Sequence, residues 1–146
     1  MDSTELSTNS RRKRRAGMAI CLGIWLPITV SAASPLLRCE ITHGGETYIA
    51  EFLPNPDPYT VEAKDINGQF RFKAVVLGNE ELIESIRIYT YYREYHQVVL
   101  LHEARYTPPF NRNEASPAPL TGVNYLYSPS VEQELQYSCG LVETSP

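Results

Sequence analysis

The sequence predicts an all-β domain, a small antiparallel β-sandwich or small barrel of about seven or eight strands. Short segments alternate apolar and polar residues, which is the period of a strand with one buried face. Turn residues such as Gly44-Gly45 and Asn67-Gly68 separate these segments. The hydrophobic content of 42% and the ten tyrosines are too high for a wholly disordered chain, and a length of 146 residues suits one domain.

The expected strands follow one another along the chain and are joined by turns. They span residues 37–41, 47–52, 59–66, 69–77, 85–93, 98–106, 123–127 and 135–141. Asn67-Gly68 is the strongest hairpin pattern, because both central residues of the favoured turn need positive φ. Three prolines within 53–58 break strand pairing, four more predict a loop over 108–120, and 79–82 is expected to form one short helical turn. The capping-box pattern at 130–133 is followed by strict alternation, which favours a turn and then a strand.

Residues 1–33 have the three parts of a secretory signal peptide. A basic n-region over 11–15 precedes an apolar h-region over 16–30, and small residues favour cleavage after Ala33, with Ala32 as the neighbouring alternative. The apolar run is shorter than the roughly 20 residues of a spanning helix, and an uncleaved anchor is the alternative. We therefore expect residues 34–146 to form a single exported domain, periplasmic or extracellular, which meets a membrane only through the signal segment before cleavage.

Charge is unevenly distributed along the chain. The formal net charge is −4, but the five basic residues at 11–15 hide a more acidic body. From Ser34 onward, eight basic and fifteen acidic residues leave a balance of −7. Nucleic-acid binding requires clustered Lys and Arg to neutralise phosphates. The balance excludes a basic nucleic-acid-binding body, and we expect no nucleic-acid partner.

The cysteines predict one disulfide. Cys21 lies in the h-region and would leave with it, so the exported domain keeps Cys39 and Cys139. Two cysteines in an exported chain most often pair, and neither belongs to a C-x-x-C motif that would indicate redox or metal chemistry. Each cysteine shares the alternation of the apolar residues around it, so both sulfurs are expected to point into the core.

The segment Tyr137-Ser138-Cys139 resembles the Tyr-x-Cys pattern of immunoglobulin domains. The partner cysteine lies near the start of the domain, and Trp25 would leave with the signal peptide. The resemblance therefore implies an immunoglobulin-like architecture only.

No pattern in the sequence indicates a catalytic centre, a metal site or a cofactor. His43 adjoins a Gly-Gly turn and His96 lies in a predicted turn, so both are expected in solvent. His102 shares the alternation of Val98 and Leu100 and is expected to be a hydrogen-bonded core or edge histidine. No histidine pair has the i, i+2 spacing of ligands on one strand face, and the Gly-x-Ser-x-Gly and phosphate-loop motifs are absent. We expect neither an enzyme nor a cofactor.

Tyrosine and arginine define the candidate binding surface. Arg87, Tyr89, Tyr91 and Arg93 share one side of the strand expected over 85–93. Exposed Tyr with Arg is typical of protein interfaces, and tyrosine faces also suit sugar stacking. The alternative is that these tyrosines are good strand formers that pack a second, half-covered sheet face.

These observations predict an exported, non-enzymatic domain of the cell envelope that binds another macromolecule, either an envelope protein or a glycan. One alternative is a carbohydrate- or peptidoglycan-binding module that uses the tyrosines as stacking platforms. Another is a secreted inhibitor of a lysozyme-type enzyme, because small exported barrels with that role also carry one cysteine near each end. The glycine-rich motif expected of such inhibitors is absent here.

Overall fold

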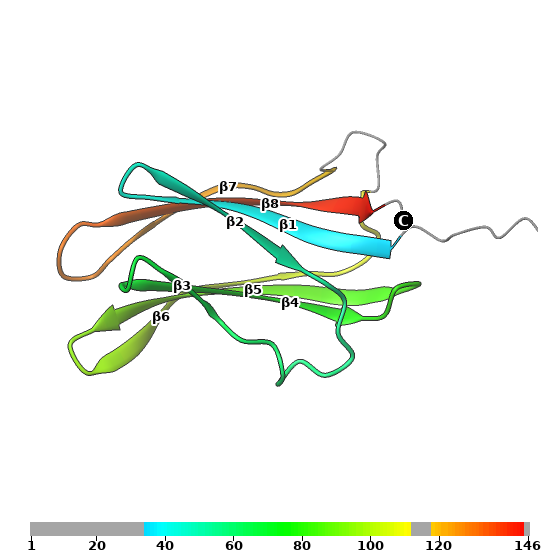
Figure 1. The fold of residues 1–146 in the computed structure, drawn as a ribbon, viewed down its shortest axis with the longest axis horizontal. Helices are drawn as coiled ribbons and strands as arrows, with labels where there is room; N and C mark the ends of the chain where they lie inside the picture. The colour runs from blue at the N-terminus through cyan, green and yellow to red at the C-terminus, as the bar shows by residue number, and fades with distance from the viewer. Residues whose placement is uncertain (1–33, 112–117, 145–146) are drawn as a thin grey trace, which may run out of the picture. The chain divides into compact units, whose positions relative to one another are not determined.

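Eight antiparallel strands form two sheets of four strands each (Figure 1). The structure is a computed structural model that describes residues 34–111 and 118–144, and the predicted signal peptide lies outside the described residues. The strands are β1 (Ser34–His43), β2 (Glu46–Phe52), β3 (Lys64–Ile66), β4 (Phe70–Gly78), β5 (Ile83–Glu94), β6 (Gln97–Tyr106), β7 (Ala118–Tyr127) and β8 (Glu134–Thr144). Sheet A has the order β2-β1-β8-β7 and sheet B the order β3-β4-β5-β6. The all-β prediction is confirmed, and the two sheets fit a small sandwich.

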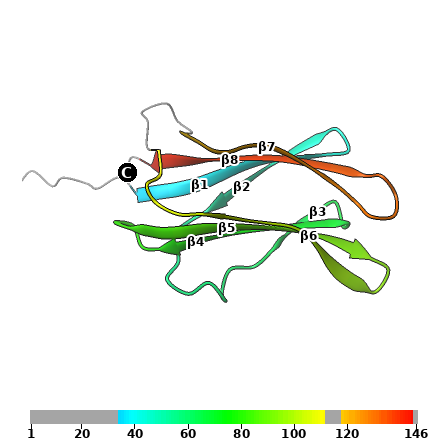
Figure 2. The same ribbon diagram turned by 180° about the vertical axis from the view of Figure 1, so that it is seen from behind.

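The two sheets lie face to face and bury their apolar sides against each other (Figures 1 and 2). The chain forms the β1–β2 hairpin in sheet A, builds all of sheet B and returns to sheet A for β7 and β8. β8 pairs with β1 from Ser34 opposite Thr144 to His43 opposite Leu135. Between the layers, Phe72 of sheet B packs edge-on against Tyr137 of β8, with ring centroids 5.2 Å apart. One core therefore joins the sheets, as expected of a sandwich.

The predicted Asn67-Gly68 hairpin is present between β3 and β4. Asn67 has a φ of 53° and Gly68 a φ of 72°, a left-handed conformation that these two residue types adopt most readily. The Asp65 carboxylate accepts a hydrogen bond from the Gly68 N–H at 2.6 Å. The turn fixes a register in which Ile66 lies opposite Phe70, and both side chains enter the core.

The predicted strand over 59–66 is wrong in its first part, because β3 begins only at Lys64. Asn55 instead makes an isolated parallel bridge to the far end of β4. The Asn55 N–H donates to the Val76 carbonyl at 2.8 Å, and the Gly78 N–H donates to the Asn55 carbonyl at 3.3 Å. The chain then crosses from this bridge to β3 as a loop, so the alternation in 59–63 has no neighbouring strand to pair with.

The helical turn expected over 79–82 is also wrong. The Asn79 side-chain oxygen accepts the N–H groups of Glu81 and Leu82 at 2.9 and 2.8 Å. Such local bonds compete with helical ones and leave a bend. The segment 130–133 forms a turn and then a strand, as the alternation favoured. The end of the loop expected over 108–120 is wrong, because residues 118–120 already belong to β7.

A β-bulge in β6 changes which residues face the core, so that the side-chain alternation before the bulge is out of phase with the alternation after it. The β5–β6 register shifts between Thr90 and Tyr91, which lie opposite His102 and Leu100, so one extra residue stands between the two pairs. Val98 and Leu100 consequently face outward and are each 49% exposed. The prediction that His102 shares a side with Val98 and Leu100 is wrong, because the bulge reverses the alternation between them.

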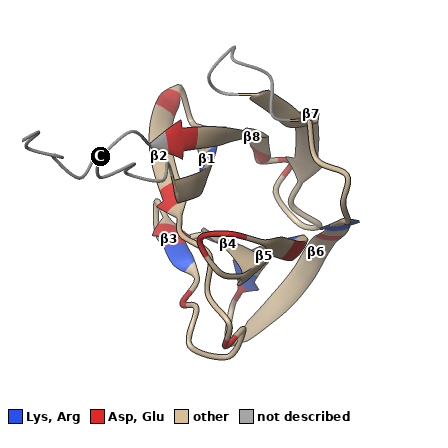
Figure 3. Cartoon of the chain, turned by 90° about the vertical axis from the view of Figure 1, so that its right-hand side faces the viewer, with Lys and Arg blue, Asp and Glu red and all other residues tan. Residues whose placement is uncertain are grey.

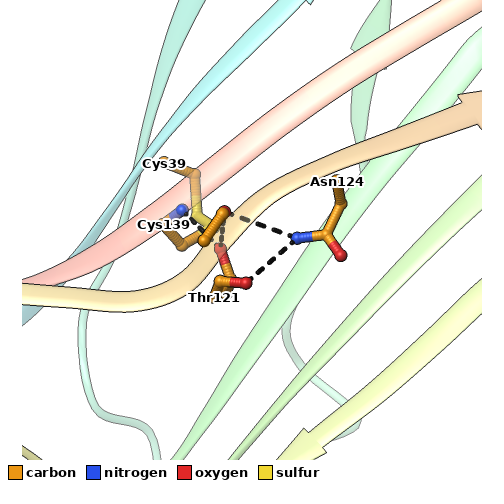
Figure 4. Close-up of a disulfide and its surroundings, with 5 residues drawn as sticks. Cys39, Thr121, Asn124 and Cys139 are labelled. Carbon is orange, nitrogen blue, oxygen red and sulfur yellow. Dashed lines mark hydrogen bonds between the residues drawn. A yellow bond between two sulfur atoms is a disulfide. The ribbon is translucent and has the colours of Figure 1, made fainter.

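The predicted Cys39–Cys139 disulfide is present and joins β1 to β8 within sheet A (Figure 4). The two cysteines lie directly opposite each other in the ladder, with Cα atoms 4.1 Å apart. Both side chains are buried in the core, as their alternation predicted. The bridge therefore reinforces the pairing of the first and last strands.

β7 departs from regular pairing beside the disulfide. Its register with β8 shifts between Pro119 and Val123. Within this gap, the Thr121 hydroxyl accepts a hydrogen bond from the Cys139 N–H at 2.9 Å (Figure 4). The Asn124 side-chain amide donates to the Thr121 carbonyl at 3.4 Å. Side-chain bonds thus replace the ladder across the bulge, and regular pairing resumes at Val123.

Three polar side-chain atoms are enclosed between β5, β6 and β8. Thr90 Oγ1, His102 Nε2 and the Tyr137 hydroxyl have no hydrogen-bond partner among the residues that the structure describes. Thr90 and Tyr137 are fully buried, and the His102 and Tyr137 ring centroids lie 6.0 Å apart. A buried hydroxyl without a partner costs roughly 1–3 kcal/mol. This part of the core is therefore a place where an apolar side chain would be more stable.

Tyr137→Phe is expected to raise the free energy of unfolding at neutral pH by about 1 kcal/mol, because it removes the hydroxyl and keeps the ring. Burial raises the pKa of Tyr137 above its usual value of 10, whereas the phenol ionises near pH 10 in the unfolded chain. The folded state then keeps a proton that the unfolded state releases. The stability that the domain gains from keeping this proton on Tyr137 is fully present below about pH 10. It is lost as the pH rises further.

Urea unfolding at neutral and alkaline pH measures both effects of Tyr137→Phe. The substitution should reduce the loss of stability above pH 10, whereas Tyr95→Phe, at an exposed turn position, should leave it unchanged. An alkaline loss of the same size in Tyr137→Phe and in the unsubstituted chain would contradict the assignment.

Candidate binding surface

The four residues of the predicted stripe lie on the outer face of β5, a central strand of sheet B. Arg87, Tyr89, Tyr91 and Arg93 alternate with buried core residues along this strand. Arg93 is exposed, and the other three are half-buried. The structure therefore brings the stripe together on one surface, where neighbouring side chains cover part of the tyrosine rings.

Charged side chains of the two adjacent strands flank the tyrosines. On β4, Lys73 lies opposite Tyr89 and Arg71 lies opposite Tyr91. On β6, Glu103 lies opposite Tyr89. Because directly paired residues project from the same face of a sheet, charged side chains border Tyr89 on both sides and Tyr91 on the β4 side, whereas Leu100 lies opposite Tyr91 on β6. Sequence reasoning missed them, since only the strand register shows which residues of β4 and β6 stand beside the stripe.

The resulting surface is strongly basic. We call it the Tyr–Arg face and define it as Arg71, Lys73, Arg87, Tyr89, Tyr91, Arg93 and Arg105. It holds five of the seven Lys and Arg residues that the structure describes. Asp65 and Glu103 are the acidic residues paired within it. Figure 3 marks the basic and acidic residues on the two layers. An acidic domain thus concentrates its positive charge on one side of one sheet.

The two tyrosines form a flat pair at the centre of this face. The Tyr89 and Tyr91 ring centroids lie 6.3 Å apart, and the ring planes differ by 16°. Burial, with smaller effects of Tyr89 and Glu103, raises the pKa of Tyr91, so its phenol stays protonated at neutral pH. At the end of the stripe, the Arg93 guanidinium lies 3.5 Å from the Asp65 carboxylate. The aromatic platform is therefore neutral and partly fixed before any partner arrives.

The loop between β2 and β3 forms one wall of a small pocket on the same face. Pro58 and Tyr59 of the loop face Val75, Arg87 and Tyr89 across a volume of about 240 Å³. Drug-sized ligands occupy roughly 300–1,000 Å³, so this pocket suits a single side chain or ring of a larger partner. The Asn55 bridge to β4 sets where the loop starts and therefore where this wall stands.

A larger polar pocket lies at the end of the sandwich where three hairpin turns meet. Its volume is about 680 Å³, and most of its lining consists of amide side chains together with one histidine: Asn67, Gln69, Gln133, Gln136 and His43. Sequence reasoning missed this pocket because its residues come from separate turns. Glu134 lines the pocket beside these amide groups, so the pocket combines neutral hydrogen-bond donors and acceptors with one acidic residue.

The prediction that His43 lies in solvent is wrong. Its side chain is only 6% exposed, and its ring packs edge-on against Phe70, with centroids 4.9 Å apart. Nδ1 lies 2.9 Å from the Glu134 carbonyl oxygen. A carbonyl can only accept a hydrogen bond, so Nδ1 carries the proton. The alternation of Cys39 and Ile41 continues to His43, and this pattern, rather than the adjacent glycines, indicates its orientation. His96 is exposed, as expected.

Metal-ligand clusters, membrane-spanning helices and similarity to known proteins are three further sources of evidence about function. Within residues 34–111 and 118–144, no three His, Cys, Asp or Glu side chains gather as metal ligands would. The same residues contain no helix long and apolar enough to cross a membrane. Comparisons with protein-family models, curated proteins and solved structures find no significant match to this chain. The function is therefore inferred from the chain's own surfaces.

Proposed function

We propose that this chain is an exported, non-enzymatic binding domain of the cell envelope that holds an acidic protein surface against its Tyr–Arg face. One observation carries the proposal. Five basic side chains share a single face with a stacked tyrosine pair, in a domain whose overall balance from Ser34 onward is −7.

The composition of the face supports a protein partner. Tyrosine and arginine bury large areas on binding and are enriched among the residues that dominate binding energy. The ring pair and the Arg93–Asp65 contact reduce the side-chain freedom that binding would otherwise remove. The concentration of basic residues favours the approach of an acidic patch and disfavours a basic one.

The location proposed for this function is outside the cytoplasm. Disulfides persist in oxidising compartments, so the Cys39–Cys139 bridge supports export. We attribute export to residues 1–33, acting as a cleaved signal peptide in front of an immunoglobulin-like sandwich. The mass of the exported protein tests this step, because cleavage after Ala33 leaves a chain that starts at Ser34.

Reversal of charge on the Tyr–Arg face is expected to weaken binding of an acidic probe. We choose poly-glutamate as the probe and Arg87→Glu combined with Arg105→Glu as the change, because these two residues lie opposite each other on β5 and β6. The affinity should fall by about tenfold or more, and binding by the unsubstituted chain should weaken as salt is added. Calorimetric titration measures both.

Arg38→Glu combined with Lys64→Glu is the matched control, because both residues are exposed, lie outside the Tyr–Arg face and change the net charge by the same amount. An equal loss in this control would show that net charge, rather than this face, controls binding. Failure of the unsubstituted chain to bind poly-glutamate at low salt would contradict the proposal.

A carbohydrate-binding role is the second candidate, and one observation favours it. The polar pocket lined by Gln69, Gln133 and Gln136 offers amide groups that match the hydroxyls of a neutral saccharide. Retention of neutral oligosaccharides on a glycan array, without retention of acidic proteins, would favour this role over the leading proposal.

A further inference from the structure

β7 is the edge strand of the described domain that lacks electrostatic protection. Each sheet has two edges, formed by β2 and β7 in sheet A and by β3 and β6 in sheet B. β2 carries Glu46 and Glu51, β3 is only three residues long, and β6 carries Glu103 and Arg105. Charges and short length are the usual means of preventing edge strands from pairing with other chains. No residue of Ala118–Tyr127 is charged.

The second part of β7 is the part open to pairing. Pro119 and the bulge that follows it interrupt the first part. From Val123 to Tyr127 the strand pairs regularly with β8. Val123, Tyr125 and Tyr127 are 53%, 56% and 60% exposed and share the outer face of sheet A. This segment therefore presents a regular backbone edge together with a row of apolar and aromatic side chains.

We propose that the Val123–Tyr127 edge pairs antiparallel with the same edge of a second copy, so that the two A sheets become one continuous sheet. A two-fold axis at Tyr125 sets the register. Tyr125 then lies opposite Tyr125 of the second copy, and Val123 lies opposite Tyr127. Aromatic pairs and aromatic–β-branched pairs across strands are favourable. On the inner face, Asn124 lies opposite Leu126.

The uncharged sequence of the edge favours a second copy as its occupant. A neutral edge offers nothing to attract a charged peptide, and its best match is another neutral strand rich in aromatic and β-branched residues, which this chain itself carries. Glu134 lies opposite Tyr127 in the ladder, and the Tyr127 hydroxyl hydrogen-bonds to its carboxylate, a contact that raises the pKa of Tyr127. The carboxylate that borders the segment is thus already engaged within one chain.

A groove lies beside this edge on the outer face of sheet A. Val123 lines it together with Pro119, Gly122 and Gly140, the charged residues Arg38 and Glu40 of β1 line it as well, and its volume is about 250 Å³. In the proposed register, Tyr127 of the second copy stands opposite Val123, at the open side of this groove. Pairing would therefore bring the exposed side chains of the two copies into contact across the new strand pair and cover part of their apolar surface.

This interface does not use the Tyr–Arg face. β7 belongs to sheet A, whereas the Tyr–Arg face is the outer side of sheet B. A dimer formed through β7 would carry two Tyr–Arg faces, so a partner with repeated acidic patches would gain by binding both. The dimer proposal can fail without affecting the proposed function, because the two rest on different sheets.

Sedimentation of the full chain tests the proposal. The chain of 16.5 kDa should give a monomer–dimer equilibrium that depends on concentration. Tyr125→Lys places two like charges opposite each other at the axis and should raise the dimer dissociation constant by about tenfold or more. Ile49→Lys is the matched control, since Ile49 lies on the outer face of the opposite edge strand, β2, and is 46% exposed. It should leave the equilibrium unchanged.

A cross-linking experiment tests the register independently. In a Cys21→Ala background, Tyr125→Cys should form a disulfide-linked dimer under mild oxidation, whereas Ile49→Cys should not. A chain that stays monomeric at every concentration would overturn the proposal. Equal weakening by Tyr125→Lys and Ile49→Lys, or equal cross-linking at both positions, would overturn it as well. Uptake of a synthetic β7 peptide by a chain that never dimerises would replace the second copy with a peptide partner.

Discussion

Replacement of both Cys39 and Cys139 by alanine is expected to lower the free energy of unfolding by about 4–5 kcal/mol. The bridge spans 100 residues of sequence, and in the chain-entropy account closing a loop of that length stabilises the folded state by about 4.7 kcal/mol. Both side chains are buried, so the loss of sulfur atoms from the core adds to the effect. Urea unfolding followed by far-ultraviolet circular dichroism measures the change.

Cys21→Ala provides the control for the disulfide prediction. It removes a cysteine that has no part in the bridge, so the stability of the domain should stay the same. Intact mass after alkylation gives a second measurement, because the bridged protein has no free thiol at Cys39 or Cys139 before reduction. A double alanine variant within 1 kcal/mol of the unsubstituted chain would show that the bridge contributes little to stability.

Gly78→Ala is expected to lower the free energy of unfolding by about 3 kcal/mol. Gly78 ends β4 with a φ of 141°, a conformation that side chains with a Cβ rarely adopt. An added Cβ would also overlap the carbonyl oxygen of Leu82, which belongs to the backbone and cannot rotate away. Backbone strain of roughly 1–3 kcal/mol and overpacking of similar size add together. The substitution should also loosen the loop that starts at Asn55, because the Gly78 N–H donates to the Asn55 carbonyl.

Gly122→Ala separates these two contributions. Gly122 has a φ of 64°, but no atom lies within 4 Å of an added Cβ. Gly122→Ala should therefore lower the free energy of unfolding only by the cost of a left-handed backbone conformation, roughly 1–2 kcal/mol. Thermal unfolding of both variants, together with the rate of proteolysis in the loop after β2, gives the comparison. Equal destabilisation by the two substitutions would mean that the contact with Leu82 relaxes without cost.

Much of the fold could be predicted because its determinants are local. Asn67-Gly68 satisfies a turn that requires two positive φ values, and alternation from Leu135 onward identifies β8 against a competing capping box. The same alternation placed Cys39 and Cys139 in the core. These features depend on a few adjacent residues, so the sequence of each segment is sufficient to find them.

The errors arise where a distant segment decides the structure. Residues 59–63 alternate like a strand, but Asn55 already pairs with the far end of β4, at Leu77. The bulge in β6 depends on how Thr90 and Tyr91 pair with β6, which alternation within one strand does not show. His43 lies next to two glycines that suggest exposure, yet the Glu134 carbonyl and the Phe70 ring enclose it.

The candidate site likewise contains some residues whose position follows from local sequence and others whose position depends on distant segments. The orientation of Arg87, Tyr89, Tyr91 and Arg93 follows from alternation along one strand and could be predicted. The charged residues of β4 and β6 on the same face could not, because their position beside the stripe depends on the register of three strands. The pocket wall at Pro58 and Tyr59 depends on a loop that returns over the sheet.

The bridge between the first and last strands also affects how the domain would respond to proteases. Cys39 and Cys139 close the intervening chain into a covalent ring that includes all of sheet B. A single cut at any peptide bond within this ring opens a loop but releases no fragment. The β1–β8 ladder continues on both sides of the bridge, from Ser34 opposite Thr144 to His43 opposite Leu135. A nicked copy would keep every strand attached, and the loss of any strand would require a second cut.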